Sequence, residues 1–430
     1  MNTSIIKHVT ISKLWGIKTI STDFDEHVNI FVGINGSSKT TFLNLIEATL
    51  LVDLRVFYSI EFEFIRIDFI GTDIQSIKVA KQEKEGDDYI NYYFDNEELI
   101  SIPCSEVMIQ RSSYRIPIRY REILTMVRDR IKSIVNISWL SVNRDNSELN
   151  DYDRHEFERF SNMVDVKLQE LEHNLVLYQL QLESESNKLA DRFKENVLSL
   201  MLYDEDKDYF KSDEITQFST VDTKAMQADL FKAFNALGVA KDKSTAIQTH
   251  VKKIKGVVDN INSNGQLTID DAFVLALINR TFSIIDISKT HESQKKEIFA
   301  QIEKFKSCLH KFMPDKEFNL NKNNEGRLEV ELNEGNSDKS VSFDLSSLSS
   351  GEKQLFILMT ESLLQKCIPH LFIADEPELS LHIGWQKLVI GELLEMNPNA
   401  QIIVATHSPE IAGNYPNSVI NMKKITTYEQ

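Results

Sequence analysis

Two motifs at opposite ends of the chain constrain its fold more than any other feature. Near the start, the apolar run HVNIFVG leads into GINGSSKTT, in which Gly33, Lys39 and Thr40 keep the spacing of a phosphate loop, G-x-x-x-x-G-K-[ST]. Near the end, LFIADEPE and QIIVATHSPE are short apolar runs that finish in polar residues. Such runs predict buried parallel strands, so we expect both ends of the chain to build one α/β sheet around a long insertion.

The phosphate loop departs from its pattern at Ser38, where a glycine is expected before the lysine. If this position requires a positive φ, serine costs on the order of 1 kcal/mol; if it requires only room, the small side chain fits. Taken alone, the segment is equally compatible with an ordinary strand-to-helix turn. We predict that it binds ATP, with Lys39 at the β- and γ-phosphates and Thr40 on Mg²⁺. The residues expected to contact the nucleotide are Asn35, Gly36, Ser37, Ser38, Lys39, Thr40 and Thr41.

An acidic pair follows the apolar run LFIA and favours the nucleotide interpretation over a plain turn. We expect Asp375 to coordinate Mg²⁺ through water and Glu376 to polarise the attacking water. The run QIIVAT ends in His407, which is suited to contact the γ-phosphate if its strand lies beside the acidic pair. The alternatives are a strand-ending turn for the carboxylates and a structural role for the histidine.

Charge and composition narrow the classes of partner. The net charge of −17 argues against a nucleic-acid footprint over the whole surface, so any DNA contact must be local. The segment from Arg111 to Lys132 carries a local excess of arginine that could face DNA or an acidic partner, or form a solvated helix face. No run of eighteen apolar residues occurs, which predicts a cytoplasmic protein without membrane contact.

The middle of the chain has two kinds of periodicity. Between residues 58 and 95, alternating polar and apolar residues predict an antiparallel meander. From about Glu122 the period becomes helical. A heptad seam is formed by Val164, Leu168, Leu171, Leu175, Tyr178 and Leu182, and a second helical set by Ile298, Ile302, Phe305 and Phe312. These sets predict either an antiparallel helical hairpin or an ordinary helical subdomain.

Four motifs stand in a recognisable order: GINGSSKTT, LSSGEKQ, FIADEPELSLH and ATHSP. In this order they resemble the ABC-type ATPases of the branch that includes RecF, the SMC proteins and the OLD family. The resemblance implies a P-loop ATPase head made of residues 1–120 and 314–430, with a helical, coiled-coil-like insertion at 121–313. It also implies that two heads meet face to face and enclose ATP and Mg²⁺ between them.

The resemblance assigns further residues by position. Ser349, Gly351 and Glu352 would contact the partner head's ATP, with Ser350 where the family usually has glycine. Residues 380–382 would form the loop that crosses between the heads. Gln110 is the candidate for a glutamine that touches Mg²⁺, and ISWLSVNRD is the competing segment.

About two dozen residues follow His407, too few for the nuclease domain of the OLD family proper. The architecture resembles the ATPase subunits of two-component bacterial anti-phage systems, such as AriA of PARIS and PtuA of Septu, and is closer to the first. This resemblance implies an oligomeric sensor that controls a separate effector nuclease and answers to a phage protein. Two alternatives stay open: a RecF-like repair ATPase that clamps DNA, and a nucleotide-gated scaffold with negligible hydrolysis.

Overall fold

The computed structural model describes residues 4–84, 86–104, 108–110, 113–115, 118–141, 163–202, 222–264, 269–319, 329–332 and 341–428. The chain divides into two compact units. The first comprises Met1–Val176 and Lys304–Gln430, and the second comprises Leu177–Glu303. Each unit is described by itself below.

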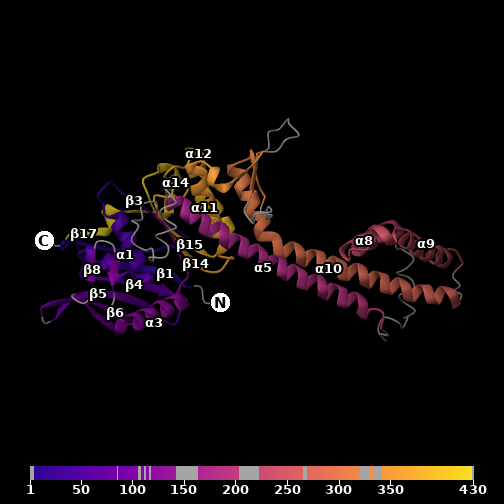
Figure 1. The fold of residues 1–430 in the computed structure, drawn as a ribbon, viewed down its shortest axis with the longest axis horizontal. Coiled ribbons are helices and arrows are strands. Elements are labelled where there is room, and N and C mark those ends of the chain that lie inside the picture. Colours follow the sequence, from indigo (N-terminus) through magenta and orange to yellow (C-terminus); the bar gives the residue numbers. More distant parts are fainter. Residues whose placement is uncertain are drawn as a thin grey trace. The chain divides into compact units, whose positions relative to one another are not determined.

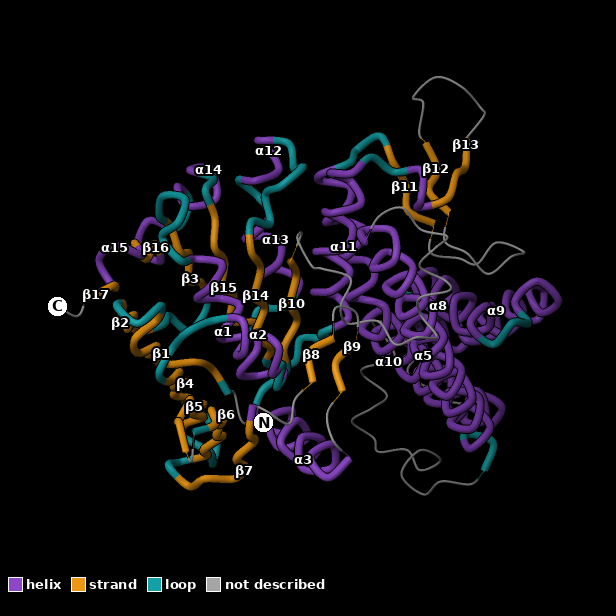
Figure 2. The backbone as a smooth tube through the Cα atoms, turned by 60° about the vertical axis from the view of Figure 1, so that its left-hand side comes forward, coloured by secondary structure: helices purple, strands orange, loops and turns teal. Residues whose placement is uncertain are grey.

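A five-stranded sheet in the first unit joins the two ends of the chain (Figure 2). Its order is β10 (Ile137–Ser141), β14 (His370–Asp375), β15 (Ala400–Thr406), β3 (Val28–Val32), β16 (Val419–Asn421), and every pairing is parallel. All seven residues of β15 are buried, including the polar Gln401 and Thr406, and the residues between these two are apolar, as in strands covered on both faces. The predicted α/β head built from both chain ends is confirmed.

β10 and β16 are strands of this sheet that the sequence did not predict, and β10 changes the predicted domain bounds. It lies inside the range 121–313 that we assigned to a helical insertion, and it pairs with β14 from Ile137↔Leu371 to Ser141↔Asp375. A five-residue run cannot show by periodicity whether it is a buried strand or part of a helix. The segment ISWLS therefore belongs to the sheet.

The second sheet of this unit is antiparallel and has seven strands. Its order is β17 (Thr426–Tyr428), β2 (Lys18–Asp23), β1 (Ile5–Leu14), β4 (Phe64–Ile70), β5 (Ser76–Lys84), β6 (Asp87–Phe94), β7 (Glu97–Pro103). Strands β4 to β6 follow one another as the predicted meander, and β7, which the sequence did not predict, continues it. The expected first strand begins later than its sequence pattern, because Leu54–Ser59 forms α2.

Helix α1 (Lys39–Leu51) lies between the two sheets and contacts strands of both, namely β14 and β15 on one side and β4 and β5 on the other. Its buried side chains join one hydrophobic core with residues of each sheet. Within that core Phe42 packs on Phe31 of β3 with ring centroids 5.0 Å apart. This packing fixes the strand, the loop after it and the first turn of α1 as one rigid piece.

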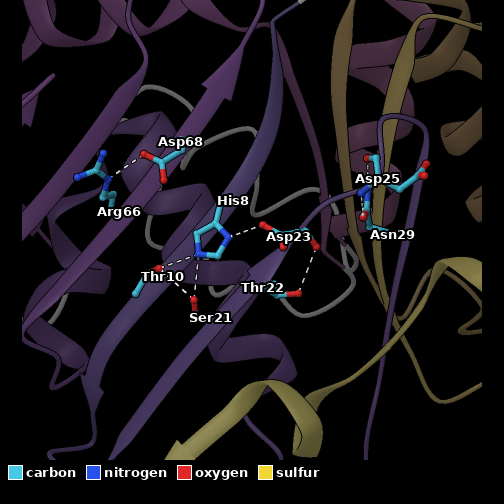
Figure 3. A network of polar contacts seen from close by, with 9 residues as sticks. All are labelled: His8, Thr10, Ser21, Thr22, Asp23, Asp25, Asn29, Arg66 and Asp68. Atoms are coloured by element: carbon cyan, nitrogen blue, oxygen red, sulfur yellow. Dashed lines mark hydrogen bonds and ion pairs between the residues drawn. The ribbon is translucent and has the colours of Figure 1, made fainter.

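Polar contacts attach the antiparallel sheet to the start of β3 (Figure 3). Asn29 accepts from the backbone N–H of Asp25 at 2.7 Å and donates to the Asp25 carbonyl at 2.8 Å. On the exposed side of β1 and β2, the His8 side chain makes two hydrogen bonds. Its Nδ1 lies 2.7 Å from Asp23 Oδ1, and its Nε2 lies 2.9 Å from Ser21 Oγ. These bonds hold the turn that leads into β3 and thus into the phosphate loop.

The remaining elements of the first unit surround these sheets. They are α3 (Ile118–Ile134), β8 (Met108–Gln110), β9 (Ser113–Arg115), β11 (Lys316–Asn319), β12 (Glu329–Leu332), β13 (Val341–Asp344), η3 (Leu345–Ser347), α11 (Ser350–Leu364), α12 (Ile383–Gln386), α13 (Val389–Met396), α14 (Pro409–Gly413), η4 (Pro416–Ser418) and α15 (Met422–Ile425). In this part of the chain three short strands precede the helix α11, which begins at Ser350.

The second unit is helical and contains an antiparallel helix pair (Figure 1). The pair consists of residues 177–199 of α5 (Met163–Ser199) and residues 269–303 of α10 (Ile269–Phe312), and Phe193 stacks on His291 with ring centroids 4.6 Å apart. Two further helices, α8 (Thr223–Ala236) and α9 (Ala240–Asn264), form small apolar cores with α10 around Met226 and Leu230. The hairpin is thus present, and α8 and α9 add a subdomain to it. No helix among the described residues is long and apolar enough to cross a membrane.

Candidate functional site

The phosphate-loop segment connects the end of β3 to the start of α1. Ser38 is the N-cap of α1 and has φ 68° and ψ 23°, a left-handed conformation. The position therefore requires a positive φ, and serine carries a strain that glycine would not. Gly36 also has a positive φ, of 79°, in open surroundings. The loop keeps the left-handed conformation although the usual glycine is replaced.

Lys39 lies at the centre of the site, and only 5% of it is exposed. Its Nζ donates to the Gly33 carbonyl at 3.0 Å and lies 2.7 Å from His407 Nε2. Burial lowers the pKa of Lys39, while the carboxylates of Glu376 and Asp375 act in the opposite direction. A buried ammonium that faces two carboxylates and a helix N-terminus can neutralise the charge of a phosphate.

Asp375 ends β14 next to the first turn of α1. A hydrogen bond with the Thr40 side chain lowers the pKa of Asp375, but burial outweighs it and raises that pKa. The Oδ1 atom of Asp375 is buried and makes no hydrogen bond, and the same is true of Ser37 Oγ. Unpartnered buried oxygens of this kind need an explanation, and a hydrated cation beside Thr40 supplies one. The donor set therefore fits Mg²⁺ that is shared with a phosphate.

Glu376 follows directly and has a positive φ of 49°. Its backbone N–H donates to the Ala405 carbonyl at 2.8 Å, which extends the pairing of β14 with β15 by one residue. The carboxylate points toward His407, with Oε1 3.7 Å from Nε2, and the Glu376 side chain is 32% exposed. It is thus open to water, as a residue that activates a water molecule must be.

Glu378 is a member of the site that the sequence analysis missed. Its Oε1 accepts from Thr406 Oγ1 at 2.5 Å, from the His407 N–H at 2.9 Å and from the Ser408 N–H at 3.1 Å. Three donors on one oxygen fix the turn that carries His407. The sequence pointed to Glu378 only as a third acidic residue in the run DEPE, next to Pro377. Its hydrogen-bond partners lie 28 to 30 residues further along the chain, so the sequence alone could not show its role.

Residues 349–352, which we call the signature segment, lie at the start of α11. Ser349 is the N-cap and forms a capping box with Glu352, and Glu352 Oε1 also accepts from Lys316 at 2.7 Å. Burial would raise the pKa of Glu352, but Lys316 and the Ser349 backbone hold it below its usual value. A Cβ built on Gly351 would collide with the Ser380 carbonyl, so only glycine fits beside the crossing loop.

Two predicted elements are only partly described. Gln110 ends β8, which pairs with β9, but its side chain lies outside what the structure describes. Arg111 also lies outside the described residues. On α3, the Arg128 guanidinium lies 3.4 Å from the carbonyl oxygens of Leu51 and Val52, and Arg130 lies over the Phe94 ring at 4.9 Å. Both arginines are therefore engaged with the protein itself.

Comparison with known proteins assigns the chain to a family. The family model described as AAA ATPase domain matches residues 5–412. No curated protein matches the chain.

Solved structures of Smc head domains are similar to this chain at low identity. One, from Pyrococcus furiosus, is a Smc head domain with an extended coiled coil bound to the C-terminal domain of ScpA; it is 15% identical, with 96% of this chain and 92% of that chain covered and a TM-score of 0.43. Another, from Pyrococcus yayanosii, is a Smc head domain with a coiled coil and joint; it is 16% identical, with 96% and 93% covered and a TM-score of 0.41. The family assignment rests on the sequence match alone.

Proposed function

The chain belongs to the AAA ATPase domain family and is therefore an ATPase, and from this premise we propose that ATP binding and hydrolysis between two copies switch an assembly that controls a separate effector. The observation that carries the proposal is the approach of Lys39 Nζ to His407 Nε2 at 2.7 Å, with Glu376 beside them. A lysine, a histidine and a carboxylate from three separate elements meet at one helix N-terminus.

The proposed chemistry assigns one task to each side chain. Lys39 leaves the Gly33 carbonyl and neutralises the β- and γ-phosphates, and His407 contacts the γ-phosphate. Glu376 accepts the proton of the attacking water. Mg²⁺ held near Thr40 and Asp375 would supply charge neutralisation on the phosphate oxygens. Electrostatic positioning thus accounts for catalysis, with no covalent intermediate on the protein.

The proposed assembly places the signature segment on a second copy. Ser349, Gly351 and Glu352 lie at the N-terminus of α11, where backbone N–H groups can face an anion. By the resemblance to ATPases whose two heads meet face to face, the ATP that they contact would be the partner's. Gln110 stays the proposed additional contact to Mg²⁺.

The biological task that fits best is that of a sensor and scaffold in a cytoplasmic anti-phage defence system. In this proposal the effector is a separate nuclease subunit, the trigger is a phage protein, and the helices of the second unit offer the docking surface. The net charge of −17 supports protein partners over direct DNA binding. The rival hypothesis is a RecF-like DNA clamp that would use the basic segment from Arg111 to Lys132, in which Arg128 and Arg130 are exposed and also make contacts within the protein.

The decisive experiment compares the wild type with Glu376→Gln and with Glu410→Gln, a matched control whose carboxylate pairs with Lys387 at 3.2 Å. We expect all three to bind ATP, only Glu376→Gln to lose turnover, and ATP to shift that variant from monomer to dimer in mass measurements. Absence of ATP binding by the wild type would refute the proposal. ATP binding without wild-type turnover would leave a nucleotide-gated scaffold.

DNA binding is measured on the same samples. The defence proposal expects no salt-sensitive association with duplex DNA, whereas a clamp would lose affinity steeply as salt rises. Strong binding that Arg121→Ala and Lys132→Ala weaken would favour the repair alternative.

A further inference from the structure

Lys18 connects the phosphate loop to an exposed aromatic ring. Its Nζ lies 3.5 Å from Ser38 Oγ on one side and 5.9 Å from the centroid of the Tyr428 ring on the other. The ammonium group thus lies between the loop that would hold the phosphates and a tyrosine on another strand. The distances from Lys18 Nζ to the loop and to the ring are short enough for one bound nucleotide to contact all three residues.

The position of Tyr428 follows from the sheet. β17 lies beside β2 (Figure 2) and pairs antiparallel with it. The register places Tyr428 directly opposite Lys18. β17 is an edge strand of its sheet, and 66% of Tyr428 is exposed. The ring is therefore held by the backbone pairing and by Lys18, while much of its surface stays open to solvent. The neighbouring turn also exposes Trp15 and Ile17, at 44% and 51%.

A partly exposed aromatic ring beside a phosphate-binding loop can bind a nucleobase. Nucleobases stack on aromatic faces, and the stacking is tolerant of base identity because every base has a π face. A lysine over such a ring is attracted by its electrons and stays available to an anion. Lys18 is thus positioned to contact a phosphate or ribose oxygen while the base lies against the tyrosine.

We propose that Tyr428 is the stacking platform for the base of the bound nucleotide and that Lys18 is a phosphate-contacting residue that also orients the ring. This inference rests on the proposed nucleotide function and extends it from the phosphates to the base. Its ligand class is a nucleoside triphosphate in which the base and the phosphates are recognised by separate parts of the first unit.

The test measures binding of two ligands to the full chain: ATP, and inorganic tripolyphosphate, which has no base. Replacing one stacked aromatic residue by alanine weakens binding roughly 5- to 150-fold, so we expect Tyr428→Ala to weaken ATP binding by about tenfold or more. Tripolyphosphate binding should stay unchanged, and Tyr428→Phe should restore ATP binding. The matched control is Tyr89→Ala, which removes a similar ring under Lys84 at 5.8 Å on the β5–β6 hairpin.

Lys18→Ala should weaken the binding of both ligands, because both carry phosphates, and Lys18→Arg should retain most of it. The proposal is overturned if Tyr428→Ala leaves ATP affinity unchanged, or lowers the affinity for both ligands equally, while the wild type binds both. That result would leave the phosphate-loop function intact. If the wild type binds neither ligand, the proposed function fails, and this inference fails with it.

Discussion

His407 Nε2 lies 2.7 Å from Lys39 Nζ, although the two residues are 368 positions apart in the sequence. The parallel pairing of β15 with β3 causes this meeting, because both strands end at the same edge of the sheet. Carboxyl ends of parallel strands are the usual place for ligand binding in such sheets. The geometry therefore places the histidine beside Lys39 of the phosphate-loop segment.

Replacing His407 tests whether this contact serves catalysis. We expect His407→Ala to lower kcat by roughly 10²- to 10³-fold, the loss typical of removing one group that stabilises a transition state. The ATP dissociation constant should change far less, because Lys39 stays in place. Steady-state turnover and equilibrium binding measure the two effects separately. An unchanged kcat would assign His407 a structural role.

Ser38 gives a prediction about backbone strain. Ser38→Gly removes the penalty of a left-handed serine, about 1 kcal/mol, but glycine also gains freedom in the unfolded chain, worth roughly 0.5–1 kcal/mol. We therefore expect a change in unfolding free energy of under about 1 kcal/mol, together with unchanged or faster ATP turnover. Ser38→Ala is the control, because it keeps the strain and removes only the hydroxyl. Urea unfolding compares the three proteins, and a large loss in the glycine variant would contradict the strain argument.

Glu378 should matter for stability as well as activity. Glu378→Ala leaves Thr406 Oγ1 without its acceptor at Glu378 and removes one acceptor from the N–H groups of His407 and Ser408, although the Ser408 N–H keeps Thr406 Oγ1 at 2.8 Å. Because one unsatisfied buried group costs about 1–3 kcal/mol, we expect an unfolding free energy lower by about 1–3 kcal/mol and a reduced kcat. Glu378→Gln should be milder because its amide oxygen can still accept. Urea unfolding and ATP turnover measure both. Full activity in the alanine variant would show that the turn holds His407 without this carboxylate.

Much of this architecture could be predicted from the sequence, because it depends on local signals. The phosphate-loop spacing and the alternation of β4 to β6 each occur within a few residues. β10 could not be predicted, since a short apolar run has no decisive period. The role of Glu378 depends on a long-range contact, and the docking of α8 and α9 on α10 leaves no heptad signal.

Asp375 couples function to stability through its ionisation. Burial raises its pKa above the usual value of 3.8, so in the folded protein the charged form is disfavoured relative to the unfolded chain. Folding stability is then greatest below the unfolded pKa and falls as pH rises through the folded one. We expect Asp375→Asn to be more stable than the wild type at pH 7, with turnover lost. Unfolding curves at pH 7 and 5 should show the difference shrinking at lower pH, and a destabilised asparagine variant would contradict this.

His370 gives the opposite pH dependence. Burial lowers its pKa from 6.5 to about 4, against the opposing effect of a backbone hydrogen bond at Ile137, and its Nε2 lies 2.8 Å from Ser138 Oγ. Between these two pH values the unfolded chain binds a proton that the folded protein does not, so stability is present above pH 6.5 and is lost as pH falls toward 4. At 1.36 kcal/mol per pKa unit, the unfolding free energy falls by about 3 kcal/mol over this pH range. Urea unfolding from pH 7 to 4.5 should show a shallower loss in His370→Gln than in the wild type, and parallel curves for the two proteins would remove His370 as the cause.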